Sequence, residues 1–234
     1  MSKTEIFIDA AQLASRTADW IAGLIVAKRG RFRIALTGGS TPRGLYSELA
    51  SRDGVDWSQV EFFWGDERFV PHDHPDSNYR MARETLLSHI AVPPENIHPM
   101  TGEGDPDAAA RQYEAMLKRA YGSETLDPAR TLFDLVLLGL GSDGHICSLF
   151  PGSPVLDEKQ RWVVSVPKGR PETRITLTYP AIESSRMTAF VVTGAEKAQA
   201  VEAVRSGDQS LPGARLRPNG ELIWLLDRAA AGLA

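Results

Sequence analysis

Short runs of apolar, β-branched and aromatic residues recur along the chain, each bounded by glycine or by charged residues. Runs of this kind are typical of strands that are buried on both faces, as in a parallel sheet. The clearest predicted strands cover residues 33–37, 60–64, 133–139 and 189–193. Further strand candidates cover residues 162–166, 174–178 and 222–226.

Segments with helical spacing of apolar residues lie between these strands, and each opens at Ser, Thr, Asp or Gly in a capping position. The predicted helices cover residues 41–52, 77–90, 107–121 and 195–206. This alternation predicts an α/β fold with a doubly wound, mostly parallel sheet and helices on both faces. The glycine- and proline-rich segments 102–107 and 206–220 are too short for linkers, so we predict a single domain over residues 1–234.

Charge and composition narrow the expected partners. The chain has 26 Lys and Arg against 30 Asp and Glu, interspersed, which leaves no continuous positive surface for nucleic acid. The longest apolar run, residues 20–27, is too short to span a bilayer and too internal for a signal peptide. We therefore expect a cytoplasmic protein. Cys147 is the only cysteine, so the chain forms no internal disulfide and no cysteine-based zinc site by itself.

The first polar segment follows the strand predicted over residues 33–37, and ligands of open α/β sheets bind beyond such strand ends. It runs through Gly38, Gly39, Ser40 and Thr41 into a helix, presenting backbone N–H groups and hydroxyls to an anion. No lysine follows the second glycine, and Pro42 stands where a nucleophile elbow needs glycine, so Walker and serine-triad interpretations weaken. The alternative, a tight turn with Ser40 or Thr41 as helix N-cap, stays open on this segment alone.

The second polar segment, residues 64–71, follows the strand predicted over residues 60–64 and contains Asp66, Glu67 and Arg68. Residues 76–79 after it have the sequence of a capped helix start. Two acids and an arginine indicate polar recognition. The alternative is a solvated charged loop with a local Glu67–Arg68 pair.

The third polar segment, residues 139–152, follows the most hydrophobic predicted strand. It matches G-x-G-x-x-G, but prolines and glycine from residue 151 onward prevent a sustained helix, so we reject dinucleotide binding. What remains is a glycine-hinged loop carrying Asp143 and His145, and an imidazole titrates near neutral pH as an acid or base. The alternatives are a structural or solvated histidine here, and a small buried Cys147 rather than a nucleophile.

Together the three segments resemble the 6-phosphogluconolactonase family, within the broader group that includes glucosamine-6-phosphate deaminases. The motifs are G-G-S-T-P at 38–42, W-G-D-E-R-F-V-P at 64–71 with D-S-N-Y at 76–79, and G-L-G-S-D-G-H-I-C-S-L-F-P-G at 139–152. The resemblance extends to R-I-T-L-T at 174–178 and T-G-A-E-K at 193–197. The deaminase branch carries an acid shortly after D-G-H, whereas residues 146–150 contain none, which favours the lactonase. The family commonly has a small residue or threonine where this chain has Ile146 and Cys147.

The resemblance implies a Rossmann-like fold and hydrolysis of 6-phospho-D-glucono-1,5-lactone to 6-phospho-D-gluconate, a step of the oxidative pentose phosphate pathway, without metal or cofactor. It implies His145 as general base for the attack of water on C1, with Asp143 stabilising the imidazole or its loop. Arg68 is expected to stabilise either the developing oxyanion or the phosphate. The implied substrate-binding residues are Gly38, Gly39, Ser40, Thr41, Arg43, Asp66, Gly144, Arg174 and Lys197.

Two other functions stay open from the sequence. One is a deaminase or isomerase acting on an amino-sugar phosphate, which needs a second acid near His145. The other is a non-catalytic sugar-phosphate sensor, since one fold can bind a ligand without turning it over. In each case the expected partner is a small phosphorylated sugar, with neither nucleic acid nor membrane, and the expected state is a monomer or weak homo-oligomer.

Overall fold

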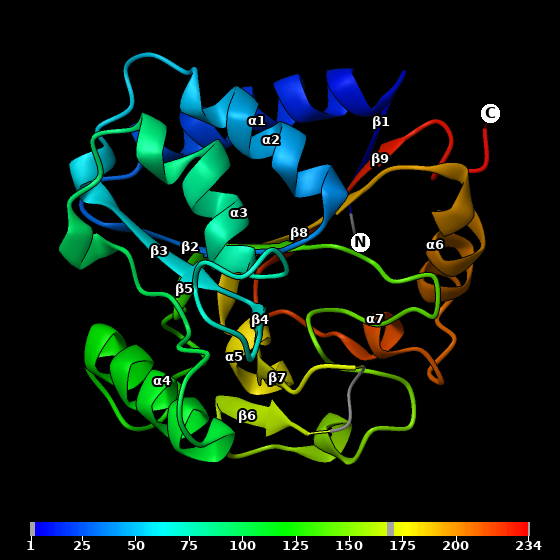
Figure 1. Ribbon diagram of the computed structural model, residues 1–234. Coiled ribbons are helices and arrows are strands. Elements are labelled where there is room, and N and C mark those ends of the chain that lie inside the picture. The colour runs from blue at the N-terminus through cyan, green and yellow to red at the C-terminus, as the bar shows by residue number, and fades with distance from the viewer. Residues whose placement is uncertain (1–2, 168–170, 234) are drawn as a thin grey trace.

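A six-stranded parallel sheet forms the centre of the molecule in the computed structural model, which describes residues 3–167 and 171–233 (Figure 1). The strand order is β1-β9-β8-β5-β2-β3. Its strands are β1 (Lys3–Phe7), β2 (Phe32–Leu36), β3 (Val60–Trp64), β5 (Phe133–Leu138), β8 (Ser185–Val192) and β9 (Glu221–Asp227). Every residue of β5 is buried, as expected for a central strand with helices on both faces. Every residue of β3 is also buried, although β3 is an edge strand, and its Phe62 carbonyl accepts from the His98 N–H at 2.9 Å.

Helices cover both faces of this sheet, which confirms the predicted doubly wound α/β fold. They are α1 (Ala10–Ala27), α2 (Ser40–Ala50), α3 (Asn78–Thr85), α4 (Pro106–Tyr121), α5 (Tyr179–Glu183), α6 (Ala198–Arg205) and α7 (Pro212–Arg215). In Figure 1, α1, α2 and α3 lie above the sheet, whereas α4, α5 and α7 lie below it. Among the described residues, no helix has both the length and the apolar character needed to cross a bilayer.

A second, antiparallel sheet of order β4-β7-β6 lies beside the first. Its strands are β4 (Asp66–Arg68), β6 (Val163–Val166) and β7 (Arg174–Leu177). The sequence analysis predicted no strand at β4 and offered a solvated loop there only as an alternative. Gly65 is the residue at which the chain changes sheets, since its N–H donates to Leu36 of β2 (2.8 Å) and its carbonyl accepts from Leu177 of β7 (2.8 Å). A charged segment therefore becomes a strand because β7 supplies its backbone partners.

Several helix boundaries differ from the predicted ones. The helix predicted over residues 77–90 ends at Thr85 and is followed by a 3-10 turn at Leu87–His89. The helix predicted over residues 195–206 starts as a 3-10 turn, Ala195–Lys197, before α6. Three further 3-10 turns lie at Trp57–Gln59, Pro94–Asn96 and Pro154–Asp157. Helix ends often tighten into 3-10 turns, and the sequence marks such turns less clearly than it marks the interior of a helix.

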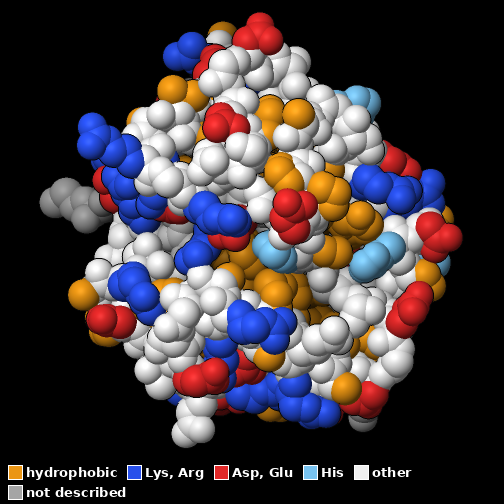
Figure 2. Space-filling view, turned by 90° about the vertical axis from the view of Figure 1, so that its left-hand side faces the viewer, with side chains coloured by type: hydrophobic (Ala, Val, Ile, Leu, Met, Phe, Trp, Pro, Cys, Tyr) orange, Lys and Arg blue, Asp and Glu red, His pale blue; other side chains and the backbone are white. Residues whose placement is uncertain are grey.

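The surface seen in Figure 2 carries Lys and Arg side chains interspersed with Asp and Glu. Ion pairs between neighbouring elements account for part of this mixing, for example Lys28 with Asp134 at 2.5 Å and Arg52 with Asp19 at 2.8 Å.

His98 makes the stability of the fold sensitive to pH. Its ring stacks on Phe63 with centroids 4.6 Å apart, and its buried Nε2 has no hydrogen-bond partner within the described part of the chain. Burial lowers the pKa of His98, so the unfolded chain takes up a proton at a higher pH than the folded chain. We expect the free energy of unfolding to fall as the pH drops from about 6.5 through the lower folded pKa.

Denaturant titrations over this pH range measure the effect. His98→Phe, which keeps a ring against Phe63, should flatten the pH dependence, whereas replacing the exposed His89 by glutamine should not. Equal slopes for wild type and His98→Phe would show that other groups set the acid sensitivity.

Candidate active site

A cavity of about 200 Å³ lies at the carboxyl ends of β2, β3, β5 and β8. The residues lining it include the predicted site residues Gly38, Gly39, Ser40, Thr41, Asp66, Arg68, His145, Arg174 and Lys197. The structure thus brings together segments that are up to about 160 residues apart in sequence. Arg43 is exposed on α2 and does not line the cavity, and Asp143 and Gly144 lie behind His145 rather than in the lining.

The turn between β2 and α2 lines the cavity, and hydrogen bonds fix its position at the end of β2. The buried Tyr46 hydroxyl donates to the Thr37 carbonyl (2.8 Å) and accepts from the Thr37 N–H (2.9 Å), which fixes the end of β2. Gly39, with φ of 110°, is the N-cap of α2 and makes no side-chain capping bond. The alternative with Ser40 or Thr41 as N-cap is therefore wrong. Ser40 and Thr41, the first residues of α2, line the cavity, and N–H groups at a helix start have no partner within the helix and suit an anion.

Asn78, at the start of α3, lines the cavity although the sequence did not single it out. Its amide Nδ2 donates to the Asp66 carbonyl at 2.9 Å. A Cβ atom on Gly38 would lie only 2.0 Å from Asn78 Oδ1, so the glycine is required by the close approach of this side chain. The only sequence signal was the capped helix start D-S-N-Y, where Ser77 accepts from the Arg80 N–H.

The two carboxylates of β4 have different surroundings, and neither is solvated. Asp66 accepts a hydrogen bond from Ser148 Oγ at 2.6 Å and lines the cavity. Glu67 is 1% exposed and points away from the cavity, toward the start of α3. Burial raises the pKa of Glu67, while backbone N–H donors oppose that rise. The alternative of a solvated charged loop is therefore wrong.

Arg68 and Arg174 lie opposite each other on β4 and β7 and both line the cavity. Arg68 Nη1 donates to the Asp76 carbonyl at 2.6 Å, and Arg174 Nη2 donates to Glu172 at 3.2 Å. The Nε of each arginine is buried without a hydrogen-bond partner in the described residues. Burial, and then the positive charge of Arg68, lowers the pKa of Arg174. Two neighbouring cations with buried unused donors indicate a site for a negatively charged group.

His145 and Asp143 form a pair whose nearest atoms, Nδ1 and Oδ1, are 2.5 Å apart. The His145 side chain is about a quarter exposed, at 28%, and its ring packs against Phe150 with centroids 4.9 Å apart. Because Asp143 accepts from Nδ1–H, the other ring nitrogen, Nε2, is the one left to take a proton. Gly144 gives this loop a left-handed turn, with φ of 75°. Its carbonyl accepts from the Gly213 N–H at 3.0 Å, which ties the loop to α7.

Lys197 and Thr193 form the part of the cavity that lies beyond β8. The Thr193 hydroxyl is 2.7 Å from that of Thr41, which joins this segment to the turn at the start of α2. The buried Asp227 carboxylate, at the end of β9, accepts from the Gly194 N–H at 3.1 Å and from the Ala230 N–H at 2.7 Å. The segment after β8, which carries Lys197, is thus held by Asp227 of β9. β9 itself does not line the cavity.

Cys147 lines the cavity and is only partly buried. It has φ of 47°, a left-handed conformation that is rare for cysteine, and a Cβ on Gly65 would lie 2.9 Å from its Sγ. Burial raises the pKa of the Cys147 thiol well above its usual value. The thiol therefore stays protonated near neutral pH, which argues against a nucleophile.

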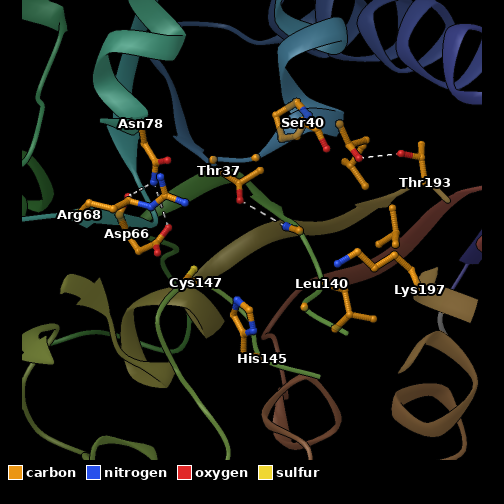
Figure 3. A pocket seen from close by; sticks show the side chains of 18 of the residues that line it. Thr37, Ser40, Asp66, Arg68, Asn78, Leu140, His145, Cys147, Thr193 and Lys197 are labelled. Atoms are coloured by element: carbon orange, nitrogen blue, oxygen red, sulfur yellow. Dashed lines mark hydrogen bonds between the residues drawn. The ribbon is translucent and has the colours of Figure 1, made fainter. Parts of the chain in front are cut away.

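Figure 3 shows two polar ends of the cavity with His145 between them. Arg68, Asp66 and Asn78 lie at one end, and Ser40, Thr193 and Lys197 lie at the other. The Lys197 ammonium points toward the middle of the cavity. In the described ranges, no group of three or more His, Cys, Asp or Glu side chains is arranged to hold a metal ion. The arrangement suits a molecule with an anionic group at one end and a bond to be hydrolysed near the histidine.

Comparison with known proteins gives a consistent set of relatives. Residues 8–224 match the family described as glucosamine-6-phosphate isomerases/6-phosphogluconolactonase. A 6-phosphogluconolactonase of Synechocystis sp. is 45% identical over 210 residues, covering 88% of this chain and 85% of the relative. One of Mycobacterium tuberculosis is 43% identical over 244 residues, covering 98% and 97%. The solved structure of 6-phosphogluconolactonase from Trypanosoma cruzi has a TM-score of 0.86 at 31% identity, covering 99% of this chain and 96% of that one.

Proposed function

Because the chain belongs to the glucosamine-6-phosphate isomerase/6-phosphogluconolactonase family, we propose that it is an enzyme that hydrolyses 6-phospho-D-glucono-1,5-lactone to 6-phospho-D-gluconate. This membership confirms the resemblance carried by the three polar segments. The observation that supports the reaction most directly is the His145–Asp143 pair, at 2.5 Å, between two cationic ends of one cavity.

The phosphate is assigned to the end formed by the α2 N-terminus and Lys197. Gly38, Gly39, Ser40 and Thr41 offer backbone N–H groups and hydroxyls there, and Lys197 adds a charge. Arg174 pairs with Arg68 across β4 and β7, at the other end of the cavity, so we do not assign it to the phosphate. We leave the exposed Arg43 out of this set.

His145 acts on the lactone carbonyl in two steps. As water attacks C1, Nε2 takes its proton, and Asp143 stabilises the imidazolium that forms. When the tetrahedral intermediate collapses, the bond between C1 and the ring oxygen breaks and the imidazolium returns the proton to that oxygen. Of the two expectations for Arg68, we propose the oxyanion at C1, because Arg68 lies at the end of the cavity away from Lys197.

The proposal needs no partner other than the phosphorylated lactone and no cofactor. We retain the expectations of a single domain, a cytoplasmic location, and a monomer or weak homo-oligomer that binds neither nucleic acid nor membrane. Acid release from freshly made 6-phosphoglucono-1,5-lactone, measured against its spontaneous hydrolysis, tests the activity. No acceleration, together with ammonia release from glucosamine 6-phosphate, would favour the deaminase. Binding of 6-phosphogluconate with neither reaction would favour a sensor.

Lys197→Ala should weaken binding of the phosphorylated substrate. A hydrogen bond to a charged group contributes about 1.5–3 kcal/mol, so KM for the phosphorylated lactone should rise about 10- to 100-fold with kcat little changed. Activity on unphosphorylated glucono-1,5-lactone should be unaffected, because that substrate makes no phosphate contact. Arg43→Ala, which removes a cation from neighbouring α2 outside the cavity lining, is the matched comparison. An unaltered KM in Lys197→Ala would exclude Lys197 from the phosphate site.

A further inference from the structure

Two side chains at one end of the cavity, Arg68 and Asn78, both depend on the chain segment at residues 76–79. The Arg68 guanidinium donates from Nη1 to the Asp76 carbonyl at 2.6 Å. Asn78 is 3% exposed, donates to the Asp66 carbonyl, and packs against Gly38 so closely that no Cβ fits there. The position of this end relative to the phosphate turn is thus set by where residues 76–79 lie.

The Glu67 carboxylate holds that segment. Oε1 accepts from the backbone N–H of Asn78 (2.8 Å) and of Arg68 itself (2.8 Å). Oε2 accepts from the backbone N–H of Tyr79 (2.8 Å) and from Ser77 Oγ (3.1 Å). The side chain is 1% exposed and does not line the cavity, so none of these bonds involves a surface that substrate reaches.

We infer that Glu67 is a positioning residue: its buried carboxylate fixes residues 76–79 and, through them, the Arg68 guanidinium and the Asn78 side chain. This inference rests on the proposed function, in which Arg68 stabilises the oxyanion. Since a displacement of about 1 Å at a reacting centre can cost on the order of 100-fold in rate, loosening this segment lowers turnover. The phosphate end is built from α2 and the segment after β8, and the four hydrogen bonds of the Glu67 carboxylate described above all go to other residues.

Two substitutions of Glu67 and one of Ser77 separate the charge, the reach and the individual hydrogen bonds of this carboxylate. Glu67→Gln keeps the shape but replaces one acceptor oxygen by an NH₂ donor, which then faces N–H or O–H donors. Glu67→Asp keeps the charge and both acceptors but is one methylene shorter. Ser77→Ala removes one donor from Oε2 and the N-cap of α3, but it leaves the three backbone bonds of the carboxylate in place and is the milder variant.

Glu61→Gln is the matched control. Glu61 is also a buried carboxylate, 7% exposed, on the adjacent strand β3, and it pairs with Arg31 (2.7 Å) and Arg33 (2.8 Å) away from the cavity. Neutralising it removes ion pairs and costs stability without moving any lining residue. Loss of stability alone therefore cannot account for a difference in turnover between the two variants.

We expect kcat of Glu67→Gln to fall about 10- to 100-fold with KM for the phosphorylated lactone nearly unchanged, and kcat of Glu61→Gln to stay near wild type. Glu67→Asp should recover part of the loss, and Ser77→Ala should show a smaller one. A kcat for folded Glu67→Gln equal to that of wild type would overturn the inference. So would equal losses of kcat in Glu67→Gln and Glu61→Gln. If Glu67→Gln does not fold, a wild-type kcat in both Glu67→Asp and Ser77→Ala overturns it instead.

Amide NMR shifts give a readout that does not depend on turnover. The N–H protons of Arg68, Asn78 and Tyr79 should move upfield in Glu67→Gln because they lose a carboxylate acceptor. Unchanged shifts at these three positions would overturn the inference even if the enzyme is a lactonase. If wild type fails to accelerate lactone hydrolysis, the proposed function fails separately, and the shifts still show whether Glu67 holds this segment.

Discussion

Replacing His145 by alanine should lower kcat for 6-phosphoglucono-1,5-lactone by about 10²- to 10⁴-fold, the usual contribution of a general base. The physical reason is the loss of the ring nitrogen that takes the proton from water, while Asp143 is left without its 2.5 Å partner. KM should change little, because the proposed phosphate contacts lie at the end of the cavity with Ser40 and Lys197 and do not include His145.

The measurement follows acid release at near-neutral pH against the spontaneous rate. His89→Ala, at an exposed histidine of the 3-10 turn after α3, controls for a general effect of removing imidazole. Retention of wild-type kcat in His145→Ala would remove this residue from the mechanism and leave Arg68 with the bound substrate as the source of catalysis.

Gly141→Ala is expected to cause the next largest loss. A Cβ atom at residue 141 would lie 2.0 Å from His145 Nδ1 and 2.5 Å from Asp143 Oδ1, so the histidine pair must move. Since the atoms that clash are side-chain ends rather than backbone, the fold should survive while His145 leaves its working position. A displacement of about 1 Å corresponds to a fall in kcat on the order of 100-fold.

Thermal unfolding and steady-state kinetics distinguish these effects. Gly23→Ala, in α1 with no atom within 4 Å of the added Cβ, is the matched control and should leave kcat unchanged. A Gly141→Ala enzyme with normal kcat would show that the loop adapts without moving the imidazole.

The central sheet could be predicted because buried parallel strands are continuous apolar runs, as in residues 133–138. Strands β1 and β4 could not. β1 has the burial pattern of an edge strand, with only Phe7 buried, so its sequence lacks a full apolar face. β4 was missed because all its residues are charged, and its strand conformation depends on β7, more than 100 residues later in the chain.

The same limit applies to the site. Glycine-rich turns and a strand-end histidine are local signals, so nine of the nineteen described residues that line the cavity were predicted from the sequence as site residues. The role of Glu67 was not, because a carboxylate beside an arginine looks like a surface pair until the start of α3 is seen against it. The need for glycine at position 141 could not be predicted either, since it depends on where the ring of His145 lies.

The pairing of the first strand with the last has a consequence for how the chain folds during synthesis. β1 lies at the edge of the sheet with β9 as its neighbour, so residues 3–7 leave the ribosome long before residues 221–227 are available to pair with them. The lining of the cavity is complete in sequence by Lys197, yet Asp227, which holds Gly194, arrives with β9. All cavity-lining residues are therefore synthesised before Asp227 can bind Gly194 and fix the segment after β8. We expect activity to appear only after β9 has left the ribosome and paired with β1 and β8.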